Sequence, residues 1–173
     1  TNTYSKQLVH QWRSEEQAIM VGTHTALMDN PALTTRLWHG QNPVRVVIDK
    51  DLKLPPESKI FSKEAKTIVF TAKSPSINHT ENHKNFIKLD FNQAVLPQLL
   101  KALHQQGIQS LIVEGGQLTL QSFIDSNLWD EIRQFKSPKM LKTGTPAPKF
   151  SAQLLKFKTN LEDKLFFYEN EKY

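Results

Sequence analysis

The chain has 173 residues and no cysteine. Without cysteine there are no disulfides, no thiolate metal ligands and no cysteine nucleophiles, and this composition is typical of the cytoplasm, where we expect the protein. No apolar run approaches the roughly 20 residues of a membrane-spanning helix, so we expect no membrane partner. The sequence therefore predicts an ordinary soluble protein whose chemistry depends on polar side chains, backbone groups or a bound cofactor.

Dense basic runs are also absent, although the formal net charge is +5 and the pI is near 9.4. This balance favours anionic partners such as phosphorylated metabolites. The lysines are spread along the chain, and neither a basic stripe nor interleaved aromatic residues accompany them. We therefore expect no nucleic-acid partner.

Familiar catalytic motifs are missing as well, because the sequence has no nucleophile elbow with an ordered serine, histidine and aspartate. Two histidines, His79 and His83, stand four residues apart, which on a helix would place both on one face. The residues around them do not favour a helix, and no third ligand is near. We expect no metal site there.

The most informative stretch runs from Gln109 to Asn127. Its short apolar run, Leu111 to Val113, is typical of a strand buried on both faces, and Glu114 then places a carboxylate at the end of the strand. Two glycines follow, and a helix is predicted to begin at about Gly116. A strand, a glycine turn and a helix N-terminus together favour an anion such as a pyrophosphate. The alternative is a plain βα turn, because the stretch matches neither the dinucleotide fingerprint nor the P-loop.

A second strand end has similar features. The apolar run Ala18 to Val21 is followed by Gly22, by two threonines and by a short helical turn. Asp29 stands in an Asp-Asn-Pro turn and can be a turn former only. Arg36 is a surface charge when considered alone, but beside an anion site it is a candidate phosphate clamp.

The rest of the chain alternates predicted strands with predicted helices and shows no internal repeat. This alternation argues for an α/β protein with a mainly parallel sheet, in one domain over residues 1–173. A hairpin at the end of the chain makes the sheet mixed. The expected helices cover 1–13 and 96–103, and the expected strands cover 44–48, 67–71, 86–89, 129–135, 154–158 and 165–168.

Four segments in this order resemble the reductase domain of the bifunctional riboflavin-biosynthesis deaminase/reductase: Ala18–Arg36, Pro43–Asp49, Leu111–Gly116 and Ser137–Lys139. The resemblance covers nearly the whole chain. It implies a dihydrofolate-reductase-like three-layer fold: a mixed, mostly parallel sheet, flanking helices and a C-terminal antiparallel hairpin. It also implies a homodimer, with one further strand and a deaminase domain preceding Thr1 in the longer protein.

The function implied by this resemblance is NADPH-dependent reduction of the ribose of 5-amino-6-(5-phosphoribosylamino)uracil to a ribityl chain, by direct hydride transfer to C1′. No residue is an obvious proton donor, so the catalytic residues are unknown. By the same resemblance, the substrate would contact Arg13, Leu33, Arg36 and Glu114, with Arg36 and Arg13 at its phosphate. The cofactor would contact Thr25, Asp29, Lys50, Gly116, Gln117, Leu118, Thr119, Leu120, Gln121 and Ser122. Charge and position alone, and not the resemblance, suggest Thr71 and Lys73 after the strand at 67–71 for the 2′-phosphate of the cofactor.

Two alternatives stay open at this point. One is another dihydrofolate-reductase-like NADPH reductase that acts on a different pterin or pyrimidine. The other is a nucleotide-binding module without catalytic activity.

Overall fold

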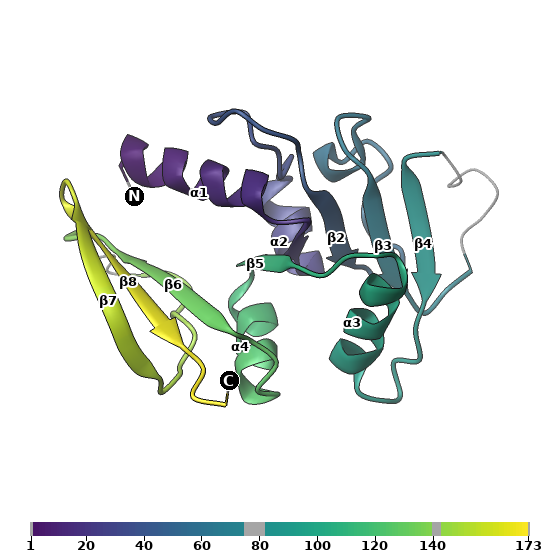
Figure 1. Ribbon diagram of the computed structural model, residues 1–173. Helices are drawn as coiled ribbons and strands as arrows, with labels where there is room; N and C mark the ends of the chain where they lie inside the picture. Colours follow the sequence, from purple (N-terminus) through teal and green to yellow (C-terminus); the bar gives the residue numbers. More distant parts are fainter. Residues whose placement is uncertain (1, 75–81, 140–142, 173) are drawn as a thin grey trace.

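The computed structural model describes residues 2–74, 82–139 and 143–172 (Figure 1). His79 lies outside these ranges. The elements in chain order are α1 (Thr3–Glu15), β1 (Ala18–Val21), α2 (Thr23–Asp29), β2 (Val44–Ile48), η1 (Lys59–Phe61), β3 (Thr67–Thr71), β4 (Lys84–Lys88), α3 (Val95–Gln105), β5 (Leu111–Gly115), α4 (Gln117–Asp125), β6 (Glu131–Lys136), β7 (Gln153–Asn160) and β8 (Asp163–Glu169). No described helix is both long enough and apolar enough to cross a membrane.

The first sheet has five parallel strands in the order β4-β3-β2-β1-β5. From β1 the chain moves outward through β2, β3 and β4, and it then returns to the opposite side of β1 to form β5. The direction of winding therefore reverses between β1 and β5. In open α/β sheets, ligands bind at the carboxyl ends of the strands where such a reversal occurs.

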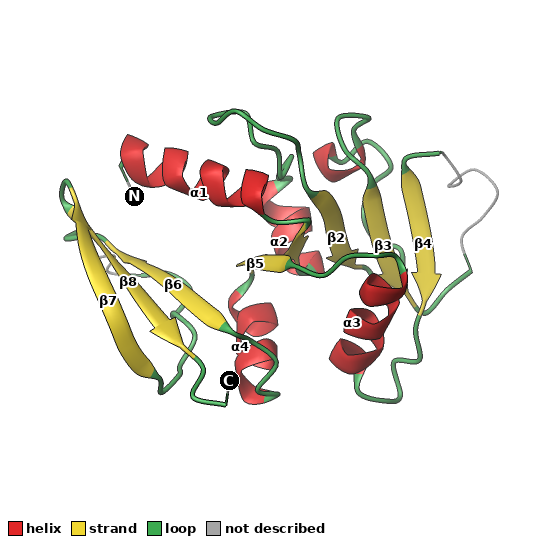
Figure 2. Ribbon diagram, in the orientation of Figure 1, coloured by secondary structure: helices red, strands yellow, loops and turns green. Residues whose placement is uncertain are grey.

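Helices cover both faces of this sheet (Figure 2). On one face, α3 and α4 contribute Leu99, Leu103 and Phe123 to a core with Met20 and Phe70. On the other face, α2 and η1 cover a second core with side chains from the same strands. All four residues of β1 are buried because they are central to both cores. The α/β class and the three layers predicted from the sequence are confirmed.

A second sheet is antiparallel, with the order β6-β8-β7. The predicted hairpin is present as β7 and β8, which pair from Gln153 with Glu169 to Asn160 with Asp163. These strands form a sheet of their own and do not extend the edge of the parallel sheet. Helix α1 joins the two sheets, since Trp12 packs with Phe167 of β8, Phe135 of β6 and Ile112 of β5.

The N-terminus of α1 is fixed to the hairpin by polar contacts. Asn2 is the N-cap and accepts a hydrogen bond from the backbone N–H of Ser5, at 2.8 Å. Asp163, almost fully buried, accepts hydrogen bonds from the Asn2 backbone N–H and the Ser5 hydroxyl, both at 2.8 Å. The start of α1 is thereby connected to the first residue of β8, about 160 residues further along the chain.

Candidate functional site

The turns that follow β1 and β5 are in direct contact. The Gly22 N–H donates to the Gly115 carbonyl at 3.3 Å. A Cβ on Gly22 would lie 2.2 Å from Thr119 Oγ1, and a Cβ on Gly116 would lie 2.9 Å from Thr25 Oγ1. Each threonine hydroxyl therefore lies against the glycine of the opposite turn. Three predicted cofactor residues, Thr25, Gly116 and Thr119, are brought together here.

Gly116 is the N-cap of α4 and has φ +80°, which favours glycine because it has no Cβ. It offers no side chain to cap the helix. The first hydrogen bond of the helix runs from the Leu120 N–H to the Gly116 carbonyl, at 3.0 Å. The N–H groups of residues 117–119 precede that bond, so they face the turn without an intrahelical acceptor. Together with the positive end of the helix dipole, these groups form a site suited to an anion.

Three other predicted cofactor residues of α4 have side chains that do not lie against the glycine turns. Leu118 is exposed, with 79% of its surface accessible. The Gln121 side chain is paired with the Lys149 backbone, donating at 3.0 Å and accepting at 2.8 Å. The Ser122 hydroxyl donates to the Thr119 carbonyl at 2.7 Å. Gln121 and Ser122 thus use their side chains within the fold, and the free donors of this helix are backbone groups of its first turn.

Arg13 and Glu114 form an ion pair beside the turns. Arg13 Nε and Nη2 donate to the two Glu114 oxygens at 2.6 and 2.5 Å. Arg13 Nη1 also donates to the Thr34 carbonyl at 3.0 Å. The side chains are only 13% and 19% exposed, so the pair is partly desolvated and geometrically fixed. Two predicted substrate residues from distant parts of the chain therefore meet.

A local irregularity in the sheet places the Glu114 carboxylate. In the pairing of β1 with β5, Met20 faces Val113 and Val21 faces Gly115. Glu114 is the extra residue at this shift, as in a β-bulge. Bulges redirect a side chain, and they are frequent beside active sites. The bulge explains how a carboxylate at the end of a buried strand reaches the guanidinium of α1.

His10 lies one helical turn before Arg13 and was missed by the sequence analysis. It is 4% exposed, and its Nδ1 atom has no hydrogen-bond partner among the described residues. Burial lowers the pKa of His10, as do the charges of Arg13 and Arg36; Glu114 and a hydrogen bond with the Thr34 backbone oppose this shift. Arg36, which is exposed, therefore lies near enough to act on the same group. The available signal was the i, i+3 spacing of His10 and Arg13, which places them on one helix face.

A buried arginine forms hydrogen bonds with the segment that contains Leu33. Leu33 is 2% exposed, has φ +52° and packs into the core beneath α2. Arg45 of β2 is fully buried and donates to the carbonyls of Ala32, at 3.3 Å, and Lys59, at 3.1 Å. Burial lowers the pKa of this guanidinium. Arg45 thereby fixes the backbone just before the Thr34 carbonyl that Arg13 contacts.

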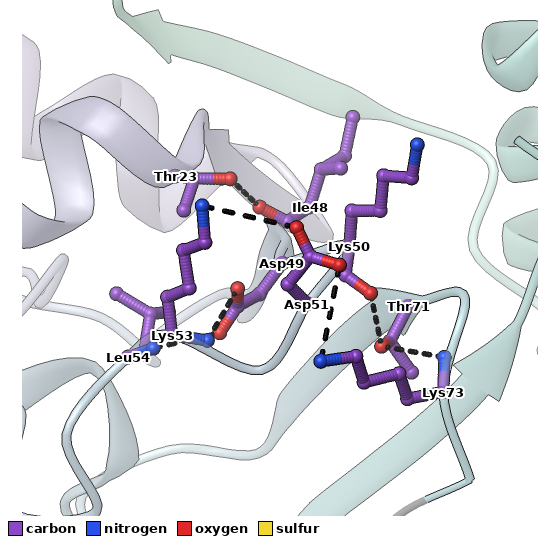
Figure 3. A network of polar contacts seen from close by, with 9 residues as sticks. All are labelled: Thr23, Ile48, Asp49, Lys50, Asp51, Lys53, Leu54, Thr71 and Lys73. Atoms are coloured by element: carbon purple, nitrogen blue, oxygen red, sulfur yellow. Dashed lines mark hydrogen bonds and ion pairs between the residues drawn. The ribbon is translucent and has the colours of Figure 1, made fainter.

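The other predicted cofactor residues lie along the same edge of the sheet. Asp29 is exposed at the end of α2, where Asn30 ends the helix in the left-handed conformation. Thr23, at the start of α2, donates to the carbonyl of Ile48 at the end of β2 (Figure 3). Lys50 lies two residues after the end of β2 and places its ammonium group 5.5 Å from the Phe91 ring centre. Within the described residues, no three histidine, aspartate or glutamate side chains gather as metal ligands would.

The chain is similar to a known protein family and to several of its members. The RibD C-terminal domain family matches residues 1–167. The riboflavin biosynthesis protein RibD of Aquifex aeolicus is 34% identical over 146 residues, which is 83% of this chain and 41% of that protein. The 2,5-diamino-6-ribosylamino-4(3H)-pyrimidinone 5′-phosphate reductase of Methanothermobacter thermautotrophicus is 33% identical over 139 residues, 77% of this chain and 64% of that protein.

A solved structure is similar over almost the whole chain. The diaminohydroxyphosphoribosylaminopyrimidine deaminase/5-amino-6-(5-phosphoribosylamino)uracil reductase of Thermotoga maritima superposes with a TM-score of 0.84 and 27% identity. The superposition covers 98% of this chain and 49% of that one. The chain thus spans about half of the Thermotoga protein and less than two thirds of the Aquifex and Methanothermobacter proteins.

Proposed function

The chain belongs to the RibD C-terminal domain family, and we propose that it reduces the ribose of 5-amino-6-(5-phosphoribosylamino)uracil with NADPH in riboflavin biosynthesis. The observation that carries this proposal is the contact of three parts: the turn after β1, the turn after β5 and the Arg13–Glu114 pair. These parts meet where the sheet reverses its winding. An anion site and a fixed ion pair side by side suit a phosphorylated cofactor and a polar substrate.

The cofactor pyrophosphate lies against the N–H groups of residues 117–119 in this proposal. Thr25 and Thr119 line the turn, and their hydroxyls lie where a side chain at Gly116 would have to fit. Asp29 and Lys50 contact the cofactor further along the same edge. A nicotinamide ring, when bound, supplies the hydride that no side chain of this chain can supply.

The substrate lies on the α1 side of the turn. Arg36 is exposed and faces the phosphate of the ribose. Arg13 uses three of its five N–H donors on Glu114 and Thr34, which leaves two for a ligand. Glu114 accepts hydrogen bonds from the polar groups of the pyrimidine. The side chain of Leu33 is buried in the core, so the backbone around Leu33 is the part that borders the substrate.

The role of these residues in catalysis is alignment. The ion pair and Arg36 hold the ring-opened sugar so that its C1′ faces the hydride donor, and correct orientation alone can contribute about 7–11 kcal/mol to lowering a barrier. Reduction of C1′ also needs one proton, which goes to the oxygen or nitrogen that shared the double bond with C1′. A water molecule or a substrate group delivers this proton.

A second pyrimidine is a natural comparison, because the Methanothermobacter relative is named for a 2,5-diamino substrate. Turnover assays with both ribosylated pyrimidines test the assignment. We expect oxidation of NADPH with the 5-amino-6-(5-phosphoribosylamino)uracil at the higher kcat/KM. No oxidation with either compound would contradict the proposed reaction, and a preference for the diamino compound would reassign the substrate.

We further propose that one more strand completes the domain between β5 and β6. Both are edge strands of their sheets, yet Ile112 of β5 and Phe135 of β6 pack against the same cluster beneath α1. An edge strand has unpaired backbone groups that accept a neighbour. Amide exchange in residues 111–115 and 131–136 should be fast in this chain and slow in a form extended at its N-terminus. Equal rates would argue against the extra strand.

The free surface of β7 favours a homodimer. Leu154, Leu155 and Phe157 are 46%, 49% and 59% exposed on this edge strand, and Leu161 in the adjoining turn is 66% exposed. Apolar side chains gathered on one surface often mark a protein interface. We expect a dimer in sedimentation equilibrium, and Phe157→Lys should shift it toward monomer. A monomeric wild-type protein would contradict this assembly.

A further inference from the structure

A group of charged side chains at the ends of β2 and β3 is not used by the contacts proposed above. Asp51 and Lys53 follow β2, and Lys73 follows β3. Figure 3 shows the Lys53 and Lys73 ammonium groups approaching the Asp51 carboxylate from two sides. We call these three residues the lysine cluster.

The contacts within the lysine cluster are long and exposed. Lys53 Nζ is 3.8 Å from Asp51 Oδ2, and Lys73 Nζ is 3.9 Å from Asp51 Oδ1. The side chains are 66%, 57% and 41% exposed for Lys53, Lys73 and Asp51. Exposed ion pairs of this kind are weak, because water screens the two charges. Both ammonium groups can therefore turn to a stronger anion at little cost.

The backbone beneath the lysine cluster is held firmly. The buried Asp49 carboxylate accepts hydrogen bonds from the N–H groups of Lys53 and Leu54, both at 2.9 Å. The buried Thr71 hydroxyl donates to the Lys50 carbonyl at 3.0 Å and accepts from the Lys73 N–H at 3.2 Å. Thr71 thus joins the two loops and positions the backbone of Lys73. Both hydrogen bonds of its hydroxyl go to the backbone, so we do not assign Thr71 to a ligand.

Strand β1 separates the lysine cluster from Glu114. The strand order is β3-β2-β1-β5, with the lysine cluster after β2 and β3, and with Glu114 and the pyrophosphate turn at the end of β5. Neighbouring strands are about 4.8 Å apart, so the ends of β2 and β3 lie roughly 10–15 Å from that turn. If the nicotinamide faces the substrate at Glu114, the adenosine half of the dinucleotide extends toward β2 and β3.

We propose that Lys53 and Lys73 bind the 2′-phosphate of the adenosine ribose, and that Asp51 holds the two ammonium groups in the free protein. This inference rests on the function proposed above, and it names the groups that select NADPH over NADH. Two ammonium groups suit a phosphate monoester, which carries close to two negative charges at neutral pH. Lysine binds phosphate as a compact charge and needs no bidentate geometry.

Titration calorimetry with NADPH and NADH tests the inference in the wild-type protein and in Lys53→Ala, Lys73→Ala and the double variant. Each single variant should lose about 10-fold in NADPH affinity, as expected for a charge-assisted hydrogen bond. Affinity for NADH should stay unchanged, and the double variant should bind both cofactors alike. Lys101→Ala, an exposed lysine on α3, is the matched control and should keep the full preference for NADPH.

Asp51→Asn is the complementary variant. It removes a carboxylate that competes with the phosphate, so it should raise NADPH affinity several-fold and leave NADH affinity unchanged. A double lysine variant that keeps the wild-type preference would overturn the inference but leave NADPH binding, and hence the proposed function, intact. Wild-type protein that binds neither cofactor would overturn both.

Discussion

Arg13 and Glu114, separated by 101 residues in sequence, join through two hydrogen bonds of 2.6 and 2.5 Å. The pair connects helix α1 to the end of β5, where the sheet reverses its winding. Its geometry depends on both ends of α1. The hairpin holds the first turn of the helix through Asp163, and the Thr34 carbonyl holds the last turn through Arg13.

Removing the charge of Glu114 tests the role of this pair. Glu114→Gln keeps the size of the side chain but loses a charge-assisted contact worth about 1.5–3 kcal/mol. We expect kcat/KM for the pyrimidine to fall about 10- to 100-fold, with NADPH affinity unchanged. Glu131→Gln, which alters an exposed ion pair with Arg133, is the control and should have wild-type kinetics. A normal kcat/KM in Glu114→Gln would remove Glu114 from the substrate site.

The positive φ of Gly116 can be separated from its contact with Thr25 by a matched pair of variants. Gly107 has φ +79° and no atom within 4 Å of the position that a Cβ would take, whereas Gly116 has φ +80° and Thr25 Oγ1 at 2.9 Å from that position. Gly107→Ala should cost about 1 kcal/mol of unfolding free energy through backbone strain alone. Gly116→Ala should cost more and should also weaken NADPH binding. Equal losses of stability, with cofactor binding intact in both, would contradict the proposed turn.

The buried His10 predicts a pH dependence of stability. Its pKa is lowered in the folded state, chiefly by burial, and the unfolded value is about 6.5. The unfolded chain therefore takes up the proton first, so folding free energy is lost as pH falls below about 6.5 and continues to be lost down to the folded pKa. In His10→Gln the melting temperature should depend less on pH between pH 7 and pH 5. This interval starts just above the pKa of histidine in the unfolded chain, which is about 6.5. An unchanged slope would show that His10 does not titrate in this way.

Asp163 predicts a second and more acidic loss of stability. Hydrogen bonds from the Asn2 backbone and the Ser5 hydroxyl lower its pKa in the folded state. Its contribution is therefore complete above the unfolded pKa, about 3.9, and is lost as pH falls toward the folded value. Asp163→Asn should lower the melting temperature at neutral pH. It should also remove the further fall in melting temperature that protonation of Asp163 causes in acid. A variant that melts like wild type at pH 7 would show that the hairpin does not anchor α1.

Much of the fold followed from local patterns in the sequence. The apolar runs at Ala18–Val21 and Leu111–Val113 are buried from both faces, so their composition alone identified them as strands of a parallel sheet. Glycines after each run marked the turns, and the family resemblance is confirmed by the match over residues 1–167. The placement of Arg13 and Glu114 on the same substrate side depended on that resemblance, since nothing local links them, and their direct contact was not predicted.

The parts that the sequence did not reveal depend on tertiary contacts. The cap at Asn2 is stabilised by Asp163 and Asn160, which are far away in the chain. The bulge at Glu114 arises from the register of β1 with β5, and periodicity within one strand contains no information about that register. Arg45 is a charged residue within an otherwise apolar strand, and only the folded structure shows that it is buried and donates to two loops.

Backbone amide NMR shifts on addition of NADPH test whether the cofactor lies on the two glycine turns. We expect the largest changes in residues 116–119 and at Thr25, with smaller changes at Lys53 and Lys73. Strand β7 serves as an internal reference and should not respond. Saturable shifts confined to residues outside the turns after β1 and β5 would contradict the account.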